Sequence, residues 1–362
     1  MKTSGLILQV LNFVMLCVCM VSCTSHHSEK GCRILNVDKK ESDIQYLKLE
    51  DYSKIELEFS KSSIVGSVSA VFAYGDKWLI QTTRRLLCFE RDGNYLCDIG
   101  RYGRGPGEHL DIQSVYVVGD TIAILSSSRK IDMYVNSGNS FRFIESKELP
   151  ANIPRPVALL YADTEFPDYV YAQNLYNGTP GVTTPVLTLY DKAWNIVDTS
   201  LAVLPSGGWR ISSPFTSSRD AVYHSTLASD TIHMIKDGRI TPRFSFDWGE
   251  SAFPQEARGS YSRILPYIIE NPKDFRILHV RSYISEDGGF IFSLLHAAGK
   301  SILLRYDLRA DKPELYAFKH ADGTPAVIQY IFSSSQNIVN VVVSPPDSKE
   351  DANPSIYTVT LN

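Results

Sequence analysis

The feature that most constrains this chain is a pattern that recurs six times: a polar turn, a strand-like run and then a second β-rich segment. The six turns with the runs that follow them span residues 75–80, 119–124, 167–172, 219–224, 287–292 and 335–340. An apolar run precedes most of these turns, and a hairpin follows most of them. Four strands per unit, at a spacing of roughly 45 to 70 residues, is typical of propeller blades. The sequence therefore predicts an all-β fold, a six-bladed β-propeller with four-stranded antiparallel blades.

The last unit indicates how the ring closes. It ends on residues 355–361, which read as a third strand with no fourth strand after it. Two strand-like segments precede the first unit, residues 44–49 and 55–59, and either one would supply the missing strand. The longest stretch between units, 251–275, fits a short helix and a plain surface loop equally well.

The first residues are expected to be a targeting signal rather than part of the folded domain. Lys2 is followed by an apolar run, Leu6 to Val21, that stops at Ser22-Cys23. This order of a short basic region, an apolar core and a small residue at its end is typical of an export signal, and the run is short for a spanning helix. We therefore expect domains at 1–22 (lipoprotein signal peptide), 23–43 (tether) and 44–362 (propeller).

The segment Met20 to Cys23 resembles the bacterial lipobox, with Met20 where Leu is usual. The resemblance implies a lipid on Cys23 and a membrane-anchored protein of the cell envelope. An ordinary cleaved signal and an uncleaved anchor are the alternatives. Residues 24–28 contain no acidic residue, unlike the start of many surface-exposed Bacteroidota lipoproteins, which favours the periplasmic side over the cell surface.

The most recognisable motif joins the first unit to the second. The stretch Asp98 to Glu108, with its Gly-Pro-Gly-Glu ending and the strands after it, resembles an NHL repeat. Together with the lipobox-like start, the chain resembles the six-bladed propeller lipoproteins of Bacteroidota. The glycines suit a sharp link between blades. Four polar residues beside them are candidate ligand-binding residues at the channel mouth, although the structural role of the link has the stronger claim: Arg101, Arg104, Glu108 and His109.

The cysteines of the first unit suggest a cross-strand disulfide. A two-residue turn at Asp92-Gly93 would place Cys88 opposite Cys97, within the range of a disulfide, and an exported protein meets oxidising conditions. A three-residue loop ending at Gly93 would slip the register by one and send the two sulfurs to opposite faces. Cys32 has no evident partner.

Composition and motifs narrow the function. A net charge of −4 without a long Lys or Arg run argues against nucleic acid as a partner. The chain has no phosphate loop, Cys-x-x-Cys or Gly-x-Ser-x-Gly motif, and no cofactor is expected. Candidate metal ligands are better explained as turn residues: Glu108, His109, Asp163, Glu165, Glu286 and Asp287. We expect a non-catalytic binding or scaffold protein for a peptide, protein or glycan; the alternative is a propeller hydrolase or lyase acting on a sugar or lactone, with or without a metal in the channel.

Overall fold

The computed structural model describes residues 31–361 apart from 128, 154–155, 162–168, 175–186, 201–213, 219–220, 259–260, 336 and 347–350. Residues Arg33–Asn362 form one compact unit. The expected signal peptide and the expected lipidation site, Cys23, lie outside the described residues. Among the helices that are described, none combines the length and the hydropathy needed to cross a bilayer.

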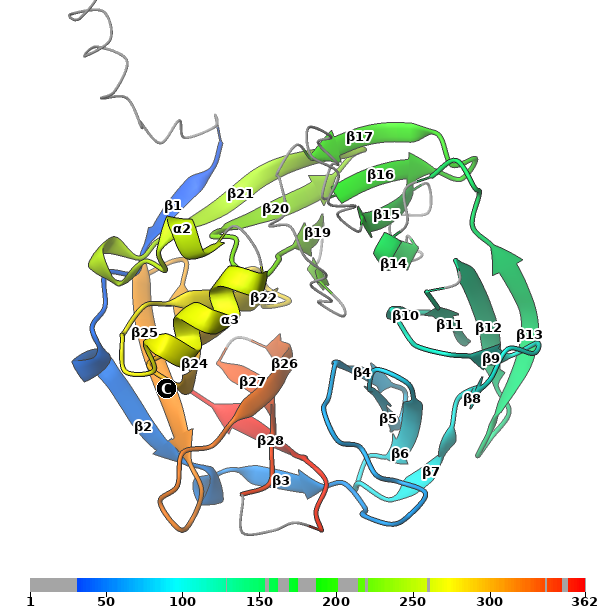
Figure 1. The fold of residues 1–362 in the computed structure, drawn as a ribbon, viewed down its shortest axis with the longest axis horizontal. Helices are drawn as coiled ribbons and strands as arrows, with labels where there is room; N and C mark the ends of the chain where they lie inside the picture. Colours follow the sequence, from blue (N-terminus) through cyan, green and yellow to red (C-terminus); the bar gives the residue numbers. More distant parts are fainter. Residues whose placement is uncertain are drawn as a thin grey trace, which may run out of the picture. The chain divides into compact units, whose positions relative to one another are not determined.

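Six sheets of four or five strands and one two-stranded sheet make up the described part of this unit. The larger sheets follow one another around a common centre (Figure 1), so the prediction of an all-β propeller is confirmed. The first three are β4 (Ala70–Tyr74), β5 (Lys77–Gln81), β6 (Leu86–Glu90) and β7 (Tyr95–Asp98); β10 (Ser114–Val118), β11 (Thr121–Leu125), β12 (Lys130–Asn136) and β13 (Phe141–Glu148); and β14 (Pro156–Tyr161), β15 (Tyr169–Asn174), β16 (Leu187–Asp191) and β17 (Ile196–Ser200).

The other three large sheets each include a strand from the N-terminal segment. They are β18 (Phe215–Ser218), β19 (Ala221–His224), β20 (Thr231–Lys236) and β21 (Arg239–Asp247) with β1 (Arg33–Asn36); β22 (Leu278–Ile284), β23 (Phe290–Ala297), β24 (Lys300–Asp307) and β25 (Lys312–Lys319) with β2 (Ile44–Lys48); and β26 (Ile328–Ser335), β27 (Ile338–Val343) and β28 (Ser355–Thr360) with β3 (Ser53–Glu56). The two-stranded sheet pairs β8 (Arg101–Tyr102) with β9 (Glu108–His109). The helices are η1 (Glu41–Asp43), η2 (Leu49–Asp51), η3 (Gly249–Ser251), α2 (Gln255–Arg258) and α3 (Tyr261–Glu270).

Both faces of the middle strands are covered, which explains their near-continuous apolar sequences. In β5, the consecutive side chains of Trp78, Leu79 and Ile80 are all buried. Trp78 and Ile80 pack toward the last sheet, where the Trp78 ring meets Phe332 edge-on at 5.4 Å between centroids, whereas Leu79 packs toward β10–β13. The core therefore lies between neighbouring sheets.

The N-terminal strands add to the edges of three successive sheets. β1 pairs in parallel with β21, with Arg33 opposite Phe244, and β2 pairs in parallel with β25, with Ile44 opposite Leu315. β3 pairs antiparallel with β28, with Ile55 opposite Ile356. Two segments were expected to supply the missing strand. Residues 55–59 overlap β3, which joins the last sheet, whereas residues 44–49 contain β2, which joins the sheet before it. Residues 33–43, expected in the tether, contain β1 and η1.

The hairpin between β6 and β7 differs from the predicted two-residue turn. Glu90 N donates to Asn94 O at 2.8 Å, so the loop has three residues and ends at Gly93, whose φ is +98°. Relative to the predicted two-residue turn, this loop moves the strand register by one residue. A register shift between Cys88 and Phe89 moves it back, so Cys88 lies directly opposite Cys97. Both cysteines are thiols in the structure, and the disulfide stays a prediction.

The stretch between the fourth and fifth sheets is helical rather than a plain loop. The longer helix, α3, lies across one face of the ring (Figure 1) and contains Pro266. Its buried side chain, Ile264, packs with Phe253 and with Leu278 of β22. The helix is therefore fixed to the ring by a small apolar cluster of its own.

Candidate functional site

The link between β7 and β10, residues 99–113, is held in one conformation by its glycines. Gly100 has a φ of +75°, and a Cβ atom there would lie 2.6 Å from the hydroxyl oxygen of Tyr134 and 2.7 Å from Cε1 of His109. The Tyr134 hydroxyl in turn donates to Gly107 O at 2.9 Å. Only glycine combines this backbone conformation with so close an approach. The Gly-rich motif therefore builds a rigid link.

Two of the predicted ligand-binding residues, Glu108 and His109, turn toward this link. The Glu108 carboxylate accepts a hydrogen bond from Gly105 N at 2.8 Å. His109 is 3% exposed, and burial lowers the pKa of its imidazole, with no partner for Nδ1 among the described residues. Both side chains thus stabilise the link, in agreement with the structural interpretation of the motif.

An ion pair between the partly buried Lys130 and the buried Asp132 supports the link. Lys130 Nζ donates to Glu108 O at 2.8 Å and lies 3.1 Å from Asp132 Oδ2. The Asp132 carboxylate is fully buried and also accepts from the Ser146 hydroxyl at 2.5 Å. Removing one member of such a pair leaves an uncompensated buried charge, which is strongly destabilising. The position of the link is therefore set by the β12–β13 hairpin.

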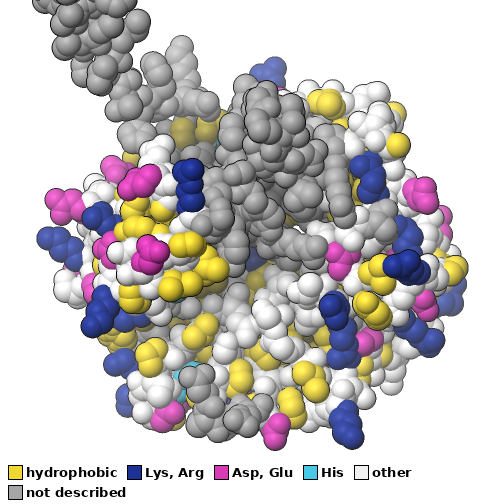
Figure 2. All heavy atoms as spheres, in the orientation of Figure 1, with side chains coloured by type: hydrophobic (Ala, Val, Ile, Leu, Met, Phe, Trp, Pro, Cys, Tyr) yellow, Lys and Arg dark blue, Asp and Glu magenta, His cyan; other side chains and the backbone are white. Residues whose placement is uncertain are grey.

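The other two predicted residues, Arg101 and Arg104, are exposed. Between them lies Tyr102, 64% exposed, and the guanidinium carbon of Arg84 lies 5.9 Å from the centre of its ring. Leu110, on the same link, is 40% exposed. We call these five residues the arginine patch. Figure 2 shows Lys and Arg side chains interleaved with hydrophobic ones on the side of this face where the sheets β4–β7 and β10–β13 lie.

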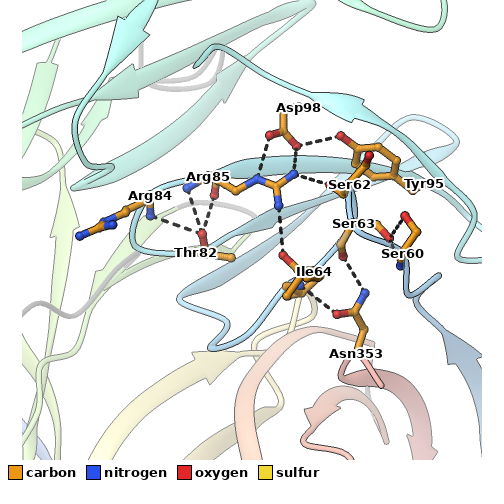
Figure 3. Close-up of polar contacts among 11 residues, drawn as sticks. Ser60, Ser62, Ser63, Ile64, Thr82, Arg84, Arg85, Tyr95, Asp98 and Asn353 are labelled. Atoms are coloured by element: carbon orange, nitrogen blue, oxygen red, sulfur yellow. Dashed lines mark hydrogen bonds and ion pairs between the residues drawn. The ribbon is translucent and has the colours of Figure 1, made fainter. Parts of the chain in front are cut away.

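The loop that carries Arg84 is fixed by a polar network (Figure 3). The neighbouring Arg85 forms two hydrogen bonds with Asp98, at 2.8 and 2.7 Å, and also donates to the carbonyl oxygens of Ser62 and Ile64. The hydrogen bond to the Asp98 carboxylate raises the pKa of the Arg85 guanidinium. Ile112 N donates to Thr83 O at 2.9 Å. The loop 82–85 and the link 99–113 are therefore joined into one surface.

The candidate metal ligands that the structure describes do not come together in a metal-binding group. Glu286 is exposed, and Asp287 is occupied by a turn, where it accepts from the Ser285 hydroxyl at 2.7 Å and from Gly289 N at 3.1 Å. These contacts, the Ser285 hydroxyl first, lower the pKa of Asp287. Asp163 and Glu165 lie outside the described residues. Within the described ranges, no group of three or more His, Cys, Asp and Glu side chains is arranged to hold a metal ion.

A Ser–His contact that the sequence did not reveal is present in the core. His279 Nδ1 lies 2.6 Å from Ser229 O, which can only accept, so Nδ1 carries the proton and Nε2 accepts from the Ser282 hydroxyl at 2.8 Å. Both side chains are at most 2% exposed, and burial lowers the pKa of His279. The two residues between them in the chain gave no motif that could have identified the pair. Because a substrate cannot reach Ser282, the contact ties β22 to the loop before β20 and is not catalytic.

A pocket of about 840 Å³ lies beside β3 and β28. Two of its four carboxylates hold backbone: Glu58 accepts from Tyr95 N at 3.0 Å, and Asp322 accepts from Thr324 N at 2.9 Å. Phe59 and Tyr357 supply aromatic surface. The pocket therefore offers volume, but Glu58 and Asp322 serve the local loops.

Comparison with known proteins identifies a family and a fold. A family model described as a domain of unknown function, DUF4934, matches residues 33–356. A solved structure of a Bacteroides fragilis protein described as exported is 15% identical, covers 91% of this chain and 100% of its own, and superposes with a TM-score of 0.66. YCF48 bound to D1 peptide is 11% identical, with 88% and 98% of the two chains covered and a TM-score of 0.47. The Pan2 WD40 domain of Neurospora crassa is 9% identical, with 80% and 74% covered and a TM-score of 0.41. A search of curated proteins finds no match.

Proposed function

The chain belongs to the DUF4934 family, and we propose that it is a non-catalytic binding propeller held at the cell envelope. In this proposal each of the six larger sheets is one blade, related to NHL-repeat blades through the link 99–113, and β3 closes the ring by pairing with β28. The signal-like start supports export, and the lipobox-like segment supports a lipid on Cys23. The absence of acidic residues at positions 24–28 supports the periplasmic side.

The observation that carries the binding role is the arginine patch. Arg101 and Arg104 are exposed on a link that is fixed by glycines and by buried hydrogen bonds. A rigid surface pays little conformational entropy when a ligand binds, because its loops are already ordered. Loops carried on a rigid scaffold are a common place for binding residues. The arrangement supports recognition, and within the described ranges no group of three or more His, Cys, Asp and Glu side chains is arranged to hold a metal ion.

Binding arrays of glycans and peptides test this role. The full chain, purified in detergent, is expected to retain at least one array component, and the double variant R101Q/R104Q is expected to lose it. The control R239Q/R243Q removes two exposed arginines from β21 and should bind normally. Failure to retain any component would refute the binding role. Cleavage of the retained component, seen as a change in its mass, would favour the hydrolase or lyase alternative instead.

Anchoring is tested separately. Labelled palmitate is expected to enter the wild-type chain and not the variant Cys23→Ala, which should be released from the membrane fraction. Equal labelling of both chains would refute lipidation at this residue.

A further inference from the structure

We infer that the arginine patch recognises an acidic polysaccharide, with uronate carboxylates on the arginines and a sugar ring on Tyr102. The inference rests on the proposed binding function and specifies its ligand class. It follows from the free N–H donors of the arginines, from the exposure of Tyr102 and from the geometry of the two-stranded ribbon formed by β8 and β9.

The guanidinium groups are the first part of the argument. Arg101 and Arg104 form no ion pair or side-chain hydrogen bond with any described residue, and the Arg84 side chain has only its contact with the Tyr102 ring. The nearby carboxylates are committed elsewhere: Asp98 to Arg85, Glu108 to Gly105 N. A free guanidinium presents a planar set of donors that matches a carboxylate with two parallel hydrogen bonds. The patch is thus locally basic on a chain whose net charge is −4.

Tyr102 is the second part of the argument. Among the aromatic residues with described exposure, it is the most exposed large side chain, at 64%, compared with 47% for Tyr46 and 40% for Phe59. An exposed aromatic face offers apolar contact area at a low cost in side-chain entropy. A uronic acid ring has one flat face of C–H groups and a carboxylate at its edge. It therefore matches a tyrosine ring that has a guanidinium beside it.

The backbone of the ribbon indicates a polymer rather than a single sugar. Arg101 and Tyr102 are successive residues of β8, so their side chains leave on opposite sides of the strand. Tyr102 is on the side of Arg84, and Arg104 lies in the turn that leads to β9. One ring on Tyr102 lies beside Arg84, whereas an extended chain with a carboxylate on each sugar can also contact the other arginines along the ribbon. The patch thus fits a run of consecutive uronate residues.

Three probes of known composition test the ligand class with the full chain in detergent. Polygalacturonate supplies carboxylates on sugar rings, its methyl ester keeps the rings without the charge, and poly-L-glutamate keeps the charge without the rings. We expect saturable binding of polygalacturonate in calorimetry, and binding of the other two weaker by about tenfold or more, because each loses either the charged hydrogen bonds or the ring contact.

Variants locate the site. R101Q/R104Q and, separately, Tyr102→Ala are expected to weaken polygalacturonate binding by about tenfold, and R239Q/R243Q to leave it unchanged. Unaltered melting curves would show that the variants are folded. Binding that survives in R101Q/R104Q, or the absence of polygalacturonate binding, would overturn the inference. Equal binding of poly-L-glutamate that is lost in R101Q/R104Q would also overturn the sugar class, while leaving the proposed binding function in place.

Discussion

The segment that joins β3 to β4 depends on one buried amide, Asn353, and its removal tests how the last sheet is joined to the first. Asn353 Oδ1 accepts from Val65 N at 2.9 Å, and Nδ2 donates to Ser63 O at 2.7 Å and to Glu58 O at 2.6 Å. The residue is 6% exposed, and Figure 3 shows it beside the Arg85 network. Asn353→Ala leaves one buried donor and two acceptors without these partners.

The expected loss follows from these three groups. A buried polar group left without a partner costs about 1–3 kcal/mol, and the carbonyl oxygens can recover part of theirs by bonding to water. We therefore expect Asn353→Ala to lower the free energy of unfolding by about 3 kcal/mol. Equilibrium urea unfolding followed by tryptophan fluorescence measures the change, because Trp78 packs between the first and last sheets. Hydrogen exchange at the Val65 amide should accelerate in parallel.

Two further variants make this test specific. Asn195→Ala removes an exposed amide that bonds to Asp191 in a turn, and is expected to cost less than about 1 kcal/mol. Asn353→Asp keeps an acceptor for Val65 N but directs a carboxylate at two carbonyl oxygens. Burial and these acceptors favour its protonated form, so its destabilisation should diminish as the pH falls. A cost for Asn353→Ala within about 0.5 kcal/mol of zero, with unchanged exchange at Val65, would refute the reasoning.

Three other predictions concern the first two sheets and the buried His224. The hydrogen bond from Cys88 lowers the pKa of Cys97 and raises that of Cys88. Iodoacetamide should therefore modify Cys97 first in the reduced protein. In the exported protein, mass spectrometry after alkylation should find neither cysteine as a free thiol. Preferential labelling of Cys88, or two free thiols after export, would contradict this. Burial lowers the pKa of His224 to about 3, so protonation of this histidine favours the unfolded chain. The free energy of unfolding is therefore retained above pH 6.5, the pKa in the unfolded chain, and decreases as the pH falls below that value. His224→Gln should reduce the slope of unfolding free energy between about pH 4 and 6.5, and an unchanged slope would argue against it. In thermal unfolding, Gly100→Ala should destabilise the protein by about 2 kcal/mol or more. The control Gly119→Ala should cost about 1 kcal/mol, because φ is also positive there but the space is open. Equal costs would show that the close contact with Tyr134 is unimportant.

The site could be predicted only in part, because a motif indicates the backbone conformation of a segment more reliably than the orientation of its side chains. The glycines of residues 100–107 correctly indicated a rigid link. The sequence could not separate Arg101 and Arg104, which are exposed, from Glu108 and His109, which hold the link. That division depends on Lys130, Asp132 and Tyr134 of another hairpin, which pack beneath the link. Arg84 was missed because its loop reaches Tyr102 only in the folded ring.

By itself, the sequence determined the repeated unit, since apolar runs separated by polar turns report local strand pairing between neighbours along the chain. It also indicated that the last unit lacked one strand, which a segment before the first unit would supply. Only the tertiary structure decided which edges they join, placing β1 on β21 and β2 on β25 in parallel, with Arg33 opposite Phe244. Strand periodicity specifies which face of a strand is buried but not its distant partner. The register of Cys88 and Cys97 was likewise decided by two shifts that cancel, because a bulge depends on packing around both strands rather than on the turn residues alone.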